Sequence, residues 1–146
     1  MPAGRIFRQF GDPAKTGADR LLGELESDVM EVLWREGRSP VRRVLEIVNA
    51  RRPAPIAYTT VLTVMQRLFE KGLLDRERME NTDHYAARQS REAFFAASSG
   101  RIVQALVEDF GDIAIAQFLA EIDRVDPDRL RRLRERAGLV ESDDAP

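Results

Sequence analysis

The chain has 146 residues, 33% of them charged and 43% apolar, a composition typical of one or two small globular units and not of a disordered chain. The absence of cysteine excludes a disulfide framework, a thiolate zinc site and an iron–sulfur cluster, and the single histidine, His84, excludes a multi-histidine metal site. Because the start has no apolar signal region and no stretch approaches the roughly eighteen apolar residues of a membrane span, we expect a cytoplasmic protein without membrane insertion.

The net charge of −2 is distributed unevenly along the chain. Residues 1–34 carry 4 basic and 6 acidic side chains, residues 35–78 carry 10 and 5, and residues 79–146 carry 9 and 14. A basic segment between acidic ends is the pattern expected of an element that binds a polyanion.

Residues 1–20 show no periodicity, and we expect them to be a flexible extension. Two helices are predicted after this segment. The first helix begins after Gly23 and ends at Gly37, and its apolar face holds Leu25, Val29, Val32 and Leu33. In the second helix, Ser39 is predicted to be the N-cap and Pro40 the first residue. Two prolines end this helix before Arg51. Its apolar face is formed by Val41, Val44, Leu45 and Val48.

A third helix is predicted from Tyr58 to Lys71, with Gly72 at its C-terminal end. At 100° per residue, one face gathers Val61, Val64, Met65 and Leu68. The opposite face carries short hydroxyls, an amide and an arginine instead of the usual Glu/Lys coat. Such side chains suit a helix that lies close to another surface.

A hairpin follows, with strands at Leu73–Arg78 and His84–Ala87 joined by the turn residues 80–83. Three helices followed by a hairpin are typical of a winged helix-turn-helix, in which the third helix enters the DNA major groove and the hairpin is the wing. Arg42 and Arg43 are expected to bind phosphate, with pairing of one of them to Glu46 as the alternative, and the third helix is expected to read bases. The side chains predicted to contact DNA are Arg42, Arg43, Tyr58, Thr59, Thr60, Thr63, Gln66 and Arg67.

The chain after residue 90 is predicted to be helical, with apolar stripes too few to enclose a large core. These stripes would be exposed in a monomer, so we expect a homodimer. The predicted dimerisation residues are Phe95, Ile102, Leu106, Phe110, Phe118, Leu119 and Ile122. The predicted fold is therefore mainly α with a small β wing: a winged helix-turn-helix at 21–89, a helical dimerisation domain at 90–138 and a flexible tail at 139–146.

Three stretches of the chain resemble the penicillinase repressor family of BlaI/MecI/CopY type. They are the run from Leu22 to Trp34, the run from Val41 to Leu45 and the run from Ala57 to Leu74, within a similarity that covers residues 21–138. The resemblance implies a homodimeric repressor that binds dyad operators near beta-lactamase or related genes. It also implies a membrane sensor and protease pathway that relieves repression.

Three features depart from that family. Without cysteine, the copper-sensing motif of one branch is absent. The predicted wing tip, residues 80–83, is acidic, which argues against a strong phosphate contact. The stretch Gln117-Phe118-Leu119 stands where beta-lactam-responsive members have a cleaved Asn-Phe bond. We therefore expect that repression is relieved by a protease with a different sequence preference or by another signal.

Functions other than DNA binding have less support in the sequence. No glycine-rich phosphate loop, Ser/His/Asp arrangement or metal-ligand spacing occurs, so we expect no enzyme, no catalytic residue, no metal and no cofactor. The alternatives are a protein-interaction adaptor and a small-molecule-sensing winged-helix regulator. Trp34 is expected to pack in the core or against another helix, and His84 to form a local hydrogen bond.

Overall fold

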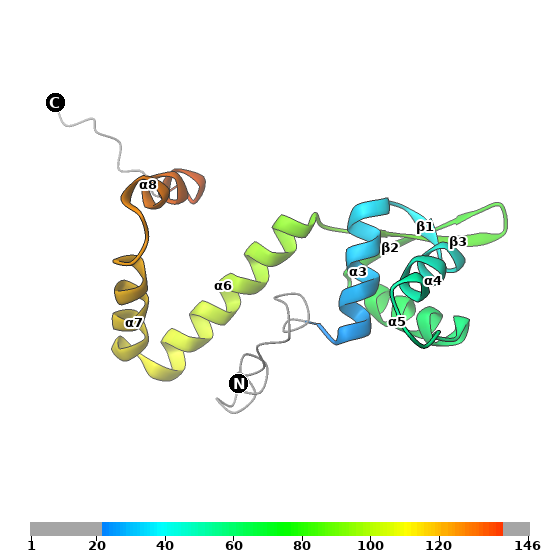
Figure 1. Cartoon of the computed structure of the whole chain (residues 1–146), viewed down its shortest axis with the longest axis horizontal. Helices are drawn as coiled ribbons and strands as arrows, with labels where there is room; N and C mark the ends of the chain where they lie inside the picture. The colour runs from blue at the N-terminus through cyan, green and yellow to red at the C-terminus, as the bar shows by residue number, and fades with distance from the viewer. Residues whose placement is uncertain (1–21, 139–146) are drawn as a thin grey trace. The chain divides into compact units, whose positions relative to one another are not determined.

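The structure, a computed structural model, describes residues 22–138, so the predictions for residues 1–20 and 139–146 lie outside it. It contains helices α3 (Glu24–Glu36), α4 (Val41–Ala50), α5 (Tyr58–Glu70), α6 (Arg91–Phe110), α7 (Asp112–Ile122) and α8 (Pro127–Arg136), as Figure 1 shows. Its strands are β1 (Ser39–Pro40), β2 (Leu74–Met79) and β3 (Thr82–Ala87).

The chain divides into two compact units, Met1–Arg101 and Ile102–Pro146, which are described separately. We call the described part of the first unit, residues 22–101, the winged head, and residues 102–138 the helical unit. The first half of α6 thus packs as part of the winged head. The functional division at residue 90 stays a prediction.

The predicted ends of α3 and α5 are confirmed to within one residue. Gly23 and Gly37 flank α3, and Gly37 adopts a φ of 78°, a conformation that costs other residues free energy. α5 begins at Tyr58 as predicted and is followed by Gly72 with a φ of 82°.

The prediction of Ser39 as a helix N-cap is wrong. Pro40 is the N-cap of α4, and Ser39 and Pro40 are extended and pair with Tyr85 and His84 of β3. The buried Ser39 hydroxyl donates instead to the carbonyl oxygen of Gly37 at 2.9 Å. Pairing with a strand more than forty residues away leaves no local signal, so the wing has three antiparallel strands in the order β1-β3-β2.

The turn of the wing is tighter than predicted. Glu80 and Asn81 alone connect the strands, with φ values of 51° and 65°, and Thr82 and Asp83 already belong to β3. Two consecutive residues with positive φ match the right-handed twist of a hairpin.

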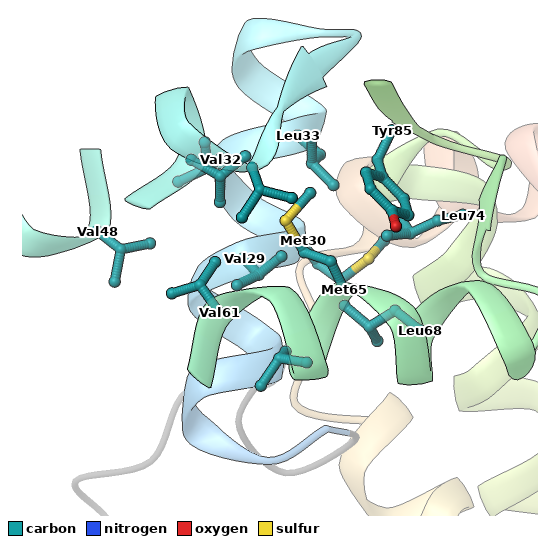
Figure 2. Close-up of a cluster of buried hydrophobic side chains, with 13 residues drawn as sticks. Val29, Met30, Val32, Leu33, Val48, Val61, Met65, Leu68, Leu74 and Tyr85 are labelled. Carbon is teal, nitrogen blue, oxygen red and sulfur yellow. The ribbon is translucent and has the colours of Figure 1, made fainter. Parts of the chain in front are cut away.

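The core of the winged head lies between α3, α4, α5 and the wing, as Figure 2 shows. Burial of each large apolar side chain in this core contributes about 1.5–3 kcal/mol of transfer free energy. Leu74 and Tyr85 join the strands to this cluster, at 0% and 1% exposure. The predicted apolar faces are confirmed, with Leu25 and Leu45 only partly buried against the cluster. The buried members are Val29, Met30, Val32, Leu33, Val41, Val44, Val48, Val61, Val64, Met65, Leu68, Leu74 and Tyr85.

The connection between α4 and α5 is fastened by one side chain. The Asn49 amide nitrogen donates to the Ile56 carbonyl oxygen at 3.1 Å, and the Ile56 N–H donates to Asn49 Oδ1 at 2.8 Å. Arg52, in the same loop, donates to Asp28 of α3 at 2.6 Å. These contacts hold the loop that sets the position of α5 relative to α4.

An aromatic cluster fixes the start of α6 to α3. Trp34 lies 5.4 Å from Phe94 and 6.0 Å from Phe95 between ring centroids, and its Nε1 donates to the carbonyl oxygen of Gln89 at 3.1 Å. Arg91 Nε lies 3.1 Å from both carboxylate oxygens of Glu31. The predicted packing role of Trp34 is confirmed.

The helical unit exposes much apolar surface. Gly111, with a φ of 60°, separates α6 from α7, and Asp126 caps the start of α8 by accepting from the Arg129 N–H at 3.1 Å. None of the described helices has the length and apolar character needed to cross a membrane. The exposed large apolar side chains of the unit are Val103, Phe110, Ile113, Ile115, Leu119, Ile122 and Leu133.

The two hydrogen bonds of Asn49 predict a specific loss of stability. We expect Asn49→Ala to lower the free energy of unfolding by about 1–3 kcal/mol, because two backbone groups of Ile56 lose their partner. Asn49→Asp keeps the acceptor but not the donor, so its loss should be intermediate. Urea unfolding measures both, and an unchanged midpoint for Asn49→Ala would contradict the assigned role.

Candidate nucleic-acid interface

The polar face of α5 points away from the core. Because Val61, Val64, Met65 and Leu68 are buried, the intervening positions are turned outward. Tyr58 is 45% exposed at the start of the helix. The structure thus brings most of the predicted contact residues onto one exposed surface: Tyr58, Thr59, Thr60, Thr63, Gln66 and Arg67.

Thr63 has less freedom than its exposure indicates. Its hydroxyl donates to the carbonyl oxygen of Thr59 at 2.8 Å, one helical turn earlier. The hydroxyl oxygen can still accept a hydrogen bond, and the methyl group can still contact a thymine methyl. Donation to a base or phosphate would require Thr63 to give up its bond within the helix.

The neighbouring arginines Arg42 and Arg43 are in different electrostatic surroundings. Arg43 lies 3.8 Å from the carboxylates of both Glu36 and Glu46. Arg42 makes no ion pair within the described residues and lines a surface hollow with Tyr58 and Gln66. Arg42 is therefore the better placed of the two to meet a phosphate.

This hollow, which we call the wing hollow, has a volume of about 450 Å³ and joins three elements. The first turn of α4, the outer face of α5 and the tip of the wing all contribute to it. Sequence reasoning did not select its wing residues, because only the fold brings residues 78–83 beside α4. The lining residues are Pro40, Val41, Arg42, Tyr58, Leu62, Gln66, Arg78, Asn81, Thr82 and Asp83.

Arginines in and beside the wing are engaged within the winged head. Arg78 lies 3.6 Å from Asp83, Arg88 lies 3.0 Å from Asp75, and Arg38 lies 3.4 Å from Glu77. The Arg76 guanidinium stacks 4.3 Å from the centre of the Phe69 ring. These exposed pairs each contribute about 1 kcal/mol or less to stability, but they reduce the positive charge available to a ligand.

The single histidine has a local role, as predicted. His84 Nδ1 lies 3.1 Å from the carbonyl oxygen of Thr82 in the same strand. Across residues 22–138, no three carboxylate or histidine side chains gather closely enough to hold a metal ion.

The predicted dimerisation residues fall in both units. Phe95 is partly buried in the aromatic cluster of the winged head, with Arg91 4.7 Å above its ring. Ile102, Leu106 and Phe118 are partly buried in the helical unit. Phe110, Leu119 and Ile122 are 40%, 57% and 36% exposed.

Comparison with known proteins gives a family match over the whole described chain. Residues 22–138 match the model of the family described as Penicillinase repressor. The chain is 40% identical over 116 residues to a transcriptional regulator BlaI in two strains of Mycobacterium tuberculosis, a match that covers 76% of this chain and 80% of each relative. The crystal structure of transcriptional regulator PA4135 has a TM-score of 0.45 and 19% identity, covering 86% of this chain and 87% of that one.

The unequal surroundings of Arg42 and Arg43 predict unequal effects on DNA binding. We expect Arg42→Ala to weaken binding to a mixed-sequence duplex and to reduce the slope of log affinity against log salt by about 0.9. Arg43→Ala, the matched control, should change both quantities less, because Glu36 and Glu46 already neutralise that guanidinium. Titrations at several salt concentrations measure both, and an equal or larger effect of Arg43→Ala would contradict this assignment.

Proposed function

This chain belongs to the penicillinase repressor family of transcriptional regulators, and we propose that it is a homodimeric repressor that binds dyad operators in double-stranded DNA. The observation that carries the proposal is the polar face of α5, which is exposed along its length while the opposite face is buried. A wing and the first turn of α4 flank this face. This is the arrangement in which a recognition helix enters the major groove.

The side chains of α5 divide into two kinds of contact in this proposal. Arg67 and Gln66 are long enough to reach base edges, where arginine binds guanine and glutamine binds adenine through paired hydrogen bonds. Thr59 and Thr60 lie in the first turn, where hydroxyls bind phosphate or a base edge. Arg42 adds a phosphate contact from α4.

The exposed apolar surface of the helical unit supports a homodimer. Ile113 is 72% exposed and Leu119 57% exposed, an unfavourable arrangement for a chain alone in water. A second copy would cover these side chains and hold two winged heads at a fixed separation. The half-sites would then lie about one turn of DNA apart, or a multiple of it.

Repression would follow from occlusion of a promoter in the cytoplasm, without a cofactor. Beta-lactamase-type or related genes are the targets that the family relationship favours. A membrane sensor and protease pathway would meet Gln117 and Phe118 inside α7, where cutting requires the helix to open locally.

The proposal is tested by selection from a pool of random duplexes with the full chain. We expect enrichment of a sequence with two-fold symmetry, whose protection in a footprint spans both halves. Enrichment of a sequence without symmetry would overturn the dyad, and no enrichment above the starting pool would overturn operator binding.

Arg67 provides the sharpest test of base recognition. We expect Arg67→Ala to weaken binding of the selected duplex by about 1–3 kcal/mol, with a smaller effect on mixed-sequence DNA. Because Arg67 is exposed, the unfolding free energy should be unchanged. Fluorescence anisotropy on both duplexes gives the two affinities, and equal losses on them would assign Arg67 to phosphate instead.

Leu119 tests the dimer without disturbing the fold of one copy. Leu119→Asp should give a monomer, because the charge would have to be buried unpaired between copies at a cost of several kcal/mol. Gln117→Asp adds the same charge at an exposed polar position of α7 and serves as the control. Sedimentation equilibrium distinguishes the two, and a Leu119→Asp variant that still sediments as a dimer would refute the predicted interface.

A further inference from the structure

The wing carries the wrong net charge for a simple phosphate-binding element. From Leu74 to Ala87 it contains two arginines and four carboxylates, a net charge of −2 with His84 neutral. Yet its tip lines the same hollow as Arg42, Tyr58 and Gln66, all on the surface assigned above to DNA. Negative charge beside a site for a polyanion weakens the binding of that polyanion. A carboxylate in this position therefore needs a physical explanation.

One pair of side chains places this charge in the hollow. Arg78 and Asp83 face each other across the hairpin, with Arg78 Nη1 3.6 Å from Asp83 Oδ1. The second terminal nitrogen of Arg78 donates to the carbonyl oxygen of Asn81 at 3.2 Å. Both side chains of the pair remain accessible, at 68% and 39% exposure. A phosphate could therefore reach Arg78, but only beside the Asp83 carboxylate.

The other carboxylates of the hairpin lie elsewhere. Glu77 pairs with Arg38 and Asp75 with Arg88, and neither these four residues nor Glu80 at the turn lines the hollow. Among the described residues that do line it, Asp83 is the only acid, and it shares the hollow with two arginines, Arg42 and Arg78. Asp83 is therefore the carboxylate of the wing that places negative charge in the hollow itself.

We propose that Asp83 is a specificity-determining residue that suppresses sequence-independent DNA binding by keeping Arg78 from phosphate. This inference rests on the proposed function. Nonspecific complexes derive nearly all their affinity from phosphate contacts and settle where those contacts are most numerous. At an operator, base contacts from α5 fix the position of the DNA. One carboxylate in the hollow thus weakens nonspecific complexes more than the operator complex.

The test compares Asp83→Asn with Glu77→Gln in the full chain. Each change removes one carboxylate of the hairpin that pairs with an arginine, but only the first does so inside the hollow. Binding is measured at several salt concentrations on a mixed-sequence duplex and on the duplex recovered by selection. Asparagine keeps an acceptor for Arg78, so the hairpin retains its cross-strand contact.

We expect Asp83→Asn to raise mixed-sequence affinity roughly two- to fivefold and to steepen its salt slope by about 0.9, the effect of one added phosphate contact. The operator affinity should rise less, so the ratio of the two affinities falls. Glu77→Gln should leave that ratio unchanged. Adding Arg78→Gln to Asp83→Asn should abolish the gain, because Arg78 supplies the new contact.

Unchanged or weaker mixed-sequence binding by Asp83→Asn would overturn the inference and leave Asp83 as a hairpin contact. Equal gains from Asp83→Asn and Glu77→Gln would overturn it in favour of a general charge effect, and so would a gain that survives Arg78→Gln. These three outcomes bear on the inference only when the chain without substitutions binds the duplex recovered by selection. Absence of that binding would instead overturn the proposed function.

Discussion

Burial of the apolar face of α5 is the interaction on which the rest of the winged head depends. Val61, Met65 and Leu68 are fully buried against the other elements, so the helix can present only one face to solvent. The helix ends in two bonds around Gly72: the Gly72 N–H donates to the Phe69 carbonyl oxygen at 3.0 Å and the Leu73 N–H to that of Leu68 at 2.9 Å. The next residue, Leu74, is the first of β2 and is buried. The wing therefore begins in the same core that orients α5.

The periodic parts of this fold could be predicted from the sequence, since each helix buries a face that recurs every three to four residues. Apart from the length of the wing turn, the error occurred where distant segments meet. Ser39 precedes a helix and satisfies the local pattern of an N-cap, but pairing with Tyr85 makes it part of a sheet. Of the site, α5 was predictable because its exposed face is the complement of its buried face. The inequality of Arg42 and Arg43 was not, because Glu36 reaches Arg43 from another helix.

Charge in the winged head is arranged by pairing more than by composition. The segment 35–78 has an excess of five positive charges, yet Arg38, Arg43, Arg52 and Arg78 each have a carboxylate within 4 Å. Arg42 has none among the described residues and lies beside the polar face of α5. A surface of this kind attracts DNA over a smaller area than the charge count indicates, and it leaves the hydrogen-bonding side chains of α5 a larger share of the recognition.

The aromatic cluster also makes the chain its own optical probe. Trp34 is the only tryptophan, and its indole ring contacts Phe94 and Phe95 at the start of α6 while its Nε1 bonds to Gln89. Loss of these contacts would move the indole into a more aqueous environment and shift its emission to longer wavelength. Fluorescence from one native side chain therefore reports whether α6 stays attached to α3, separately from signals that follow the unfolding of the helices as a whole.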